Sequence, residues 1–239
     1  MNLFVLLQAQ NVADSVQQTA AQAAQTAPAQ QEVEMNLLDM AIKGGIIMIP
    51  LLLLGLLAVY IFVERLIVIR GASKNDPSFM DRIKDFLNEG KIDDAVALCQ
   101  RTESPYARMV EKGISRLGRP MNDVQVSIEN VGNLEISKLE KGLSLLATIA
   151  GGGPMLGFLG TVTGMIQAFF QMANAGNNVD VSNLAGGIYT AMVTTVAGLI
   201  VGILAFFAYN YLVTRIDKVV RDMESHSLEF MDILNEPAN

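Results

Sequence analysis

The chain has 239 residues, of which 51% are hydrophobic and only 17% are charged. Soluble domains carry about 25% charged residues, and the deficit here falls in three segments without any charge: 44–63, 142–179 and 181–214. Each is long enough for a membrane-spanning helix, which needs roughly 20 apolar residues. The composition excludes an ordinary soluble enzyme and indicates an all-α integral membrane protein.

Charge and residue counts exclude several further classes of protein. The net charge of −7 argues against a nucleic-acid binder, which shows a basic patch or stripe. A single cysteine, Cys99, and a single histidine, His226, leave no intramolecular disulfide and no typical metal site. We predict that Cys99 packs as a small hydrophobic residue. No phosphate-binding loop or nucleophile elbow is present, so we expect no cofactor and no enzymatic activity.

The N-terminal region divides into two parts. Residues 1–36 begin with a short apolar run and continue as an Ala/Gln-rich stretch, which predicts a loose tail or the remnant of a signal peptide. Residues 37–70 predict an amphipathic lead-in followed by the first span, at about 45–69.

The distribution of Lys and Arg predicts the orientation in the membrane. One basic residue precedes the first span, 13 lie between the first and second spans, none lies between the second and third, and three follow the third. Basic residues concentrate on the cytoplasmic side. We therefore expect the N-terminus on the outer side of the membrane, and the loop at 64–141 and the C-terminus in the cytoplasm.

Segment 71–120 predicts a small helical domain in the cytoplasm. Its apolar residues recur with helical spacing, and its start and stop signals are those of short helices. The predicted helix starts are Asp76-Pro77 and Ser104-Pro105, and the predicted ends are Gly90 and Gly118.

The remaining chain predicts two long helices joined by a short loop. Residues 121–173 form one long helix that includes the second span, 174–182 form a periplasmic loop, and 183–239 form the third span with a C-terminal helix. Both helices exceed the thickness of a bilayer. The fold class is therefore a polytopic all-α protein with three transmembrane helices, two of which extend into a cytoplasmic helical bundle.

Glycines in the second and third spans occur at the spacing used for helix packing in lipid. Gly160 and Gly164 form one Gly-x-x-x-Gly pair, and Gly198 and Gly202 form another. Such pairs let two helix backbones approach closely. We predict that these four glycines pack helices together, within one chain or between chains.

Threonines accumulate in the same two spans, which contain no acid, base or histidine. A single membrane threonine commonly bonds to the carbonyl of its own preceding turn. Several on adjoining helices favour a polar surface that faces a pore or a polar partner helix. The residues predicted to line such a pathway are Thr161, Thr190, Thr194 and Thr195, with Thr163 nearby.

Three motifs resemble the MotA/TolQ/ExbB family, in its three-span ExbB and TolQ form rather than the four-span MotA form. They are Pro-Met-Leu-Gly-Phe-Leu-Gly-Thr-Val-Thr-Gly at 154–164, Leu-Ala-Gly-Gly-Ile at 184–188 and Thr-Val-Ala-Gly-Leu at 195–199. The resemblance extends over about residues 40–235. In one respect the chain departs from it, because Thr190 stands where many ExbB-like proteins carry a glutamate.

The resemblance implies a ring of five subunits around an ExbD- or TolR-like dimer whose single span carries a proton-accepting aspartate, with a TonB-like protein as a further partner. It also implies that Thr161 and Thr195 are the two pore-facing threonines. The implied function is the use of the proton motive force to energise TonB-dependent outer-membrane transport. A TolQ-like role in envelope maintenance, a purely structural scaffold, and sodium instead of proton coupling remain open alternatives. A solute transporter is disfavoured because three spans show no inverted repeat.

Overall fold

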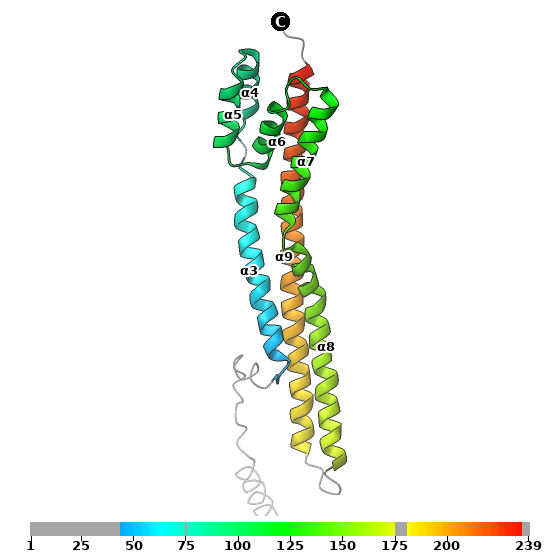
Figure 1. Cartoon of the computed structure of the whole chain (residues 1–239). Helices are drawn as coiled ribbons and strands as arrows, with labels where there is room; N and C mark the ends of the chain where they lie inside the picture. Colours follow the sequence, from blue (N-terminus) through cyan, green and yellow to red (C-terminus); the bar gives the residue numbers. More distant parts are fainter. Residues whose placement is uncertain (1–43, 75, 175–180, 236–239) are drawn as a thin grey trace, which may run out of the picture. The chain divides into compact units, whose positions relative to one another are not determined.

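The computed structural model describes residues 44–74, 76–174 and 181–235. Within these ranges the regular structure is entirely helical, and α9 is the longest element (Figure 1). The helices are α3 (Met48–Ala72), α4 (Phe79–Asn88), α5 (Ile92–Arg101), α6 (Pro105–Ile114), α7 (Met121–Glu140), α8 (Leu143–Asn174) and α9 (Val181–Asn235). The all-α prediction is confirmed. The tail at 1–36, the lead-in at 37–43 and most of the loop at 174–182 lie outside the described residues.

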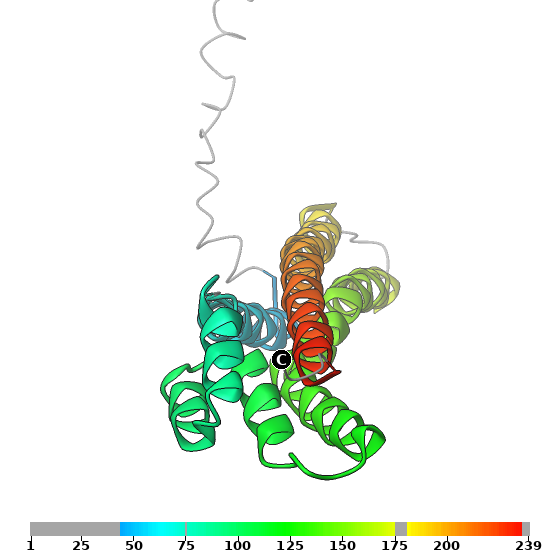
Figure 2. The same ribbon diagram turned by 90° about the horizontal axis from the view of Figure 1, so that it is seen from above.

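In the described part of the chain, three segments are long and apolar enough to cross a membrane: α3, the α7–α8 segment and α9. α3, α8 and the first half of α9 lie side by side, and α4 to α7 gather around the second half of α9 (Figures 1 and 2). We call the latter group, α4–α7 with α9 from Arg215 onward, the helical bundle. The 55 residues of α9 give a length of roughly 80 Å. This single helix therefore connects the apolar spans with the helical bundle.

The prediction of one unbroken helix over 121–173 is wrong at a single point. α7 ends at Glu140 and α8 begins at Leu143, because Gly142 adopts a φ of +84°. Only glycine enters this region of backbone space without steric cost. The amide of Leu146 then donates to the carbonyl of Gly142 at 3.1 Å, which restarts the helix. The break falls where the chain changes from polar to apolar sequence.

Two of the four predicted helix signals in the loop stand where expected. Ser104 caps α6 by accepting a hydrogen bond from the amide of Ala107 at 3.3 Å, and Gly90 follows the end of α4 with a φ of +71°. Gly118 has a φ of +85°, but it lies in the turn beyond the end of α6 at Ile114. The fourth signal is displaced, because α4 begins at Phe79 rather than at Pro77. Asp76 instead forms a turn in which its carboxylate accepts from the amide and hydroxyl of Ser78.

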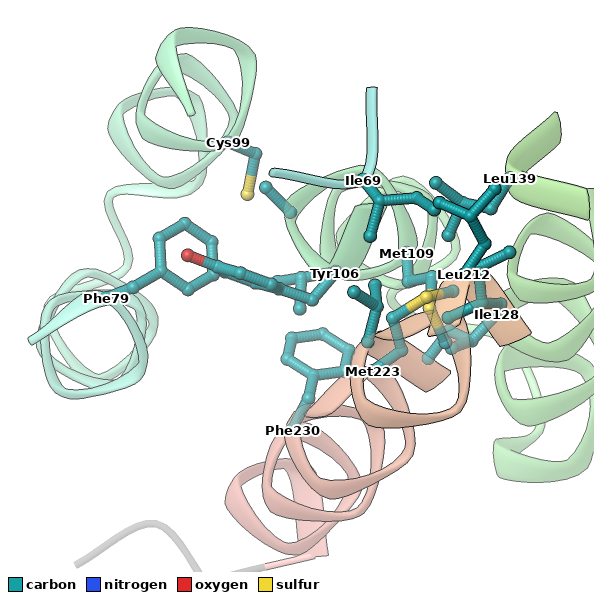
Figure 3. Close-up of a cluster of buried hydrophobic side chains, with 14 of the residues drawn as sticks. Ile69, Phe79, Cys99, Tyr106, Met109, Ile128, Leu139, Leu212, Met223 and Phe230 are labelled. Atoms are coloured by element: carbon teal, nitrogen blue, oxygen red, sulfur yellow. The ribbon is translucent and has the colours of Figure 1, made fainter. Parts of the chain in front are cut away.

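An aromatic group holds α4, α6 and α9 together in the helical bundle. The ring of Tyr106 is 3% exposed, meets Phe79 edge-on with centroids 5.1 Å apart, and stacks on His226 at 4.4 Å. Figure 3 shows Phe79 and Tyr106 in the same apolar cluster as Phe230 and Cys99. The Cys99 side chain is buried, as predicted, and this burial raises the pKa of its thiol to about 12.

Two ionic contacts attach other helices to α7. The guanidinium of Arg65, on α3, is 6% exposed and donates to the carbonyl of Lys138 at 2.9 Å. The carboxylate of Glu135 is 4% exposed and accepts from Arg108 on α6 at 2.5 Å and from Lys138 at 2.6 Å. Burial raises the pKa of Glu135, but the hydrogen bonds and charges of Arg108 and Lys138 outweigh it and lower the pKa below 4.5.

Glu135→Gln should reduce the stability of the helical bundle by about 1 kcal/mol at pH 7, a modest value because both cations are partly exposed. Since the pKa is lower in the folded than in the unfolded chain, the carboxylate contributes stability above about pH 4.5. This contribution is lost as the pH falls through the folded pKa. Thermal unfolding followed by circular dichroism should show the two proteins differing at pH 7, with the difference shrinking as the pH falls below about 4.5.

Candidate functional site

The contact between α8 and α9 is made by backbone against backbone. A Cβ added to Gly198 would lie 2.6 Å from the carbonyl oxygen of Gly153 and 2.8 Å from the Cα of Gly157. A Cβ on Gly164 would lie 2.9 Å from the Cβ of Ala191. Real side chains do not tolerate such distances. We call this contact, from Gly153 to Ala168 on α8 and from Gly187 to Gly202 on α9, the glycine seam.

All four glycines predicted to pack helices lie in the glycine seam, and they pack helices of the same chain. Gly160 leaves the space that the side chain of Thr194 fills, with the Thr194 Cβ 2.6 Å from the position of an added Cβ. Gly202 receives the ring of Pro154, whose Cδ lies 2.5 Å from the corresponding position. Sequence reasoning missed Gly153 and Gly157, although they form another pair with four-residue spacing, which ends three residues before Gly160.

Thr194 and Thr190, two of the four threonines predicted to line a pathway, have different neighbours. Thr194 is 2% exposed in the glycine seam, and its hydroxyl donates to the carbonyl of Ala191 at 2.8 Å. The methyl group of Thr190 lies 3.8 Å from the position that a Cβ on Gly45 would take, which places it toward the start of α3. Thr194 therefore packs two helices of one chain, and Thr190 belongs to a different face of α9.

A hydrogen bond from Thr195 crosses to α8 one turn before Thr161. The hydroxyl of Thr195 donates across the seam to the carbonyl of Gly157 at 2.9 Å. Thr161 lies four residues further along α8, where helix geometry directs its amide to the same carbonyl. Both side chains are half-buried. Thr195 is therefore bonded to the helical turn that leads to Thr161, although 34 residues separate the two in sequence.

The hydroxyl hydrogens of both threonines are used by backbone carbonyls. Thr161 donates to the carbonyl of Phe158 at 2.6 Å, as Thr195 does to Gly157. A hydroxyl has one hydrogen and two lone pairs, so each oxygen still offers lone pairs to an incoming donor or cation. Thr163 also bonds to its own helix, but it is exposed on another face of α8. The pair formed by Thr161 and Thr195 is thus a hydrogen-bond acceptor without charge.

The surface beside Thr161 is otherwise apolar. A shallow hollow of about 480 Å³ opens next to this residue on α8. Its other lining residues are Val162, Met165, Ile166 and Phe169. Within the described residues no group of histidine, cysteine and carboxylate side chains could hold a metal ion. The chemistry of the site is therefore that of hydroxyl oxygens within an apolar surface.

Comparison with known protein families identifies the family in which this arrangement of helices occurs. The model of the MotA/TolQ/ExbB proton channel family matches residues 101–225, a range that contains the whole glycine seam and both threonines. The chain belongs to the MotA/TolQ/ExbB proton channel family. The resemblance seen in the three motifs is thereby confirmed, and the members of this family are energising membrane subunits.

Individual relatives bear the names of both three-span branches. A biopolymer transport protein ExbB homolog of Methanothermobacter thermautotrophicus is 28% identical over 190 residues, covering 79% of this chain and 67% of the relative. An ExbB-like protein of Synechocystis is 32% identical over 188 residues, covering 75% and 71%. The Tol-Pal system protein TolQ of Haemophilus influenzae is 29% identical over 220 residues, covering 86% and 96%. The family is therefore established, whereas the branch is not.

Gly198→Ala should destabilise the spans, because the new methyl group would meet the backbone of α8. Overpacking of this kind costs about 1–3 kcal/mol, and unfolding in mixed micelles of increasing dodecyl sulfate content measures it. Gly186→Ala is the matched control on the same helix, since an added Cβ there has no described atom within 4 Å. Equal stability of the two variants would contradict the glycine seam.

Proposed function

We propose that this chain is the ring-forming subunit of an ion-driven motor in a bacterial inner membrane, which uses the proton motive force to energise TonB-dependent outer-membrane transport. The observation that carries the proposal is the hydrogen bond from Thr195 to the carbonyl of Gly157, one turn before Thr161 on α8. The names of the ExbB relatives, which describe biopolymer transport, support this branch. A TolQ-like role in envelope maintenance is the second candidate, favoured by the relative that matches over 96% of its length.

The proposed orientation has the N-terminus in the periplasm and the helical bundle with the C-terminus in the cytoplasm. The support is the distribution of basic residues, with 13 between residues 64 and 141, three after 214 and none between the second and third spans. The structure has these basic residues in the helical bundle and at the adjoining ends of the spans.

The proposed assembly is a ring of five copies around an ExbD- or TolR-like dimer. Apolar side chains that face outward from the helical bundle, beyond the spans, support contact with further chains: Leu134 is 62% exposed and Leu228 is 68% exposed. A cavity of about 660 Å³ between α7 and α9 lies beside Leu228. Large exposed apolar residues away from lipid are typical of a surface that another protein covers.

The proposed ion carrier is an aspartate in the span of the partner subunit. The second and third spans contain no acid, base or histidine, and the first span carries no charge before Glu64, near its end, so this chain supplies no mid-membrane carboxyl that can alternate between charged and neutral forms. The lone pairs of Thr161 and Thr195 accept a hydrogen bond from a protonated carboxyl. A carboxylate has no hydrogen to offer, so it gains nothing from these two oxygens.

The proposed cycle follows from that selectivity. Protonation from the periplasm neutralises the partner aspartate, which lets its helix pass the apolar surface beside Thr161. Release of the proton to the cytoplasm restores the charge and resets the position. Each charge that crosses the membrane yields about 2.3 kcal/mol per 100 mV, which is the energy available for moving the partner against the ring.

Thr161→Val and Thr195→Val should each abolish energy-dependent uptake while rings still assemble, because valine keeps the shape and removes the acceptor oxygen. Thr161→Ser and Thr195→Ser should retain activity. Thr163→Val is the matched control on another face of α8, and it should leave uptake unchanged. Uptake in cells without the chromosomal copy and native mass spectrometry of the purified complex provide the two measurements.

A structural scaffold makes a different prediction, since packing alone tolerates valine in place of threonine. Normal uptake in both valine variants would therefore contradict the proposed function and favour the scaffold. Uptake lost together with ring assembly in both serine variants would also contradict it, because serine preserves the hydroxyl.

A further inference from the structure

The groove between α3 and α9 has no part in the proposed motor. It encloses about 420 Å³, within the range of roughly 300–1,000 Å³ found for small-molecule sites. Small residues on α3 leave the space, and larger side chains on both helices form its walls. The residues that matter here are Gly55, Ala58, Phe62, Leu204, Phe207 and Tyr211. The groove is thus shaped for hydrocarbon.

A fixed cation stands at one end of this groove. Arg215 lies one turn beyond Tyr211 on α9, and its Nε and Nη2 donate to the Tyr211 hydroxyl at 3.1 and 2.9 Å. The guanidinium also lies 5.2 Å from the centre of the Tyr211 ring. Among the residues that the structure describes, no carboxylate pairs with Arg215. The positive charge is therefore held in place and not neutralised by the protein.

Lys218 adds a second cation in line with the first. It lies seven residues after Tyr211, which at about 100° per residue returns it to nearly the same side of α9. Arg221 lies ten residues after Tyr211, so it is turned about 80° from that side and lies further along α9 than Arg215 and Lys218. Two cations thus follow the groove toward the helical bundle, and a third of equal charge lies beyond them and to one side.

We propose that this groove binds an anionic glycerophospholipid, with an acyl chain between α3 and α9 and its phosphate at Arg215 and Lys218. Arginine binds phosphate through paired, charge-assisted hydrogen bonds. Anionic lipids of the cytoplasmic leaflet attract basic residues at the membrane boundary. The proposal rests on the proposed function only for the choice of leaflet.

A phospholipid fits this site better than a second copy of the chain. The second and third spans carry no acid between 142 and 179 or between 181 and 214. Either of these spans from another copy, seated in the groove, would fill it without bringing an anion to Arg215, and Glu64 of the first span already pairs with Arg65. A phospholipid supplies in one molecule both the hydrocarbon for the groove and the negative charge for the cation at its end.

The test uses the full chain in nanodiscs that contain equal amounts of phosphatidylglycerol and phosphatidylcholine. Lipid retained after transfer to mild detergent is counted by native mass spectrometry. We expect phosphatidylglycerol to be retained about tenfold over phosphatidylcholine. The double variant Arg215→Gln, Lys218→Gln should lose this preference, whereas the charge-matched control Arg221→Gln should keep it. Ala208→Phe, which fills the groove, should reduce retention of both lipids.

A diazirine on the acyl chain of the phosphatidylglycerol locates the site. Cross-links should map to 55–62 and 201–211. Equal retention of the two lipids by the unaltered chain, an equal loss in Arg221→Gln, or cross-links confined to other segments would each overturn the proposal. Cross-links confined to other segments are also the result expected if a second copy of the chain fills the groove. None of these readouts depends on uptake, so failure of the threonine variants and failure of the lipid site are distinguishable.

Discussion

The close approach of two helix backbones in the glycine seam is the constraint on which the spans depend. Lipid is as apolar as a leucine side chain, so burial of apolar surface does not drive two helices together inside a bilayer. Close van der Waals contact has to do so, and it requires residues without side chains where the helices meet. Gly157 and Gly198 meet this need, because a Cβ on either would lie within about 3.2 Å of the opposite backbone.

The close approach of α8 and α9 also determines the surroundings of two polar groups in the spans. Pro154 lacks an amide hydrogen, so the carbonyl of Ala150 loses its helical partner. The proline ring and this carbonyl both face Gly202, where only a glycine leaves room for them. The hydroxyl of Thr195 reaches the opposite helix only because Gly157 presents its backbone there. Larger side chains in the glycine seam would move α9 away from α8 and break the hydrogen bond from Thr195 to Gly157.

Much of this fold follows from local sequence signals, and the failures have identifiable causes. Charge-free segments predict the spans because lipid admits few charges, and Ser104 predicts the start of α6 because its side chain and backbone act within four residues. The break at Gly142 was missed because a glycine within a helical pattern has two meanings, a packing position or a left-handed stop. Only the tertiary structure distinguishes them.

The threonines show the same limit at the candidate site. Spacing along α9 groups Thr190 with Thr194, but each faces a different neighbouring helix, and periodicity does not say which helix lies where. The family resemblance implied Thr161 and Thr195, and the structure has Thr195 bonded to α8 one turn before Thr161. The acceptor is the backbone oxygen of Gly157, which no pattern of side chains reveals. Gly157 therefore became visible as part of the site only through its contacts.

In the proposed motor, a site made of acceptor oxygens on a rigid seam requires the movable charge to lie on another chain. Thr161 and Thr195 are fixed by bonds to carbonyls of α8, and their backbones belong to the two helices that share the most extensive contact in the described part of the protein. Such a surface does not change its charge, and rearranging its closely packed helices would cost free energy. In the proposed motor it distinguishes a neutral carboxyl from a carboxylate by geometry alone, so the work of the ion gradient appears as movement of the partner and not as deformation of the ring.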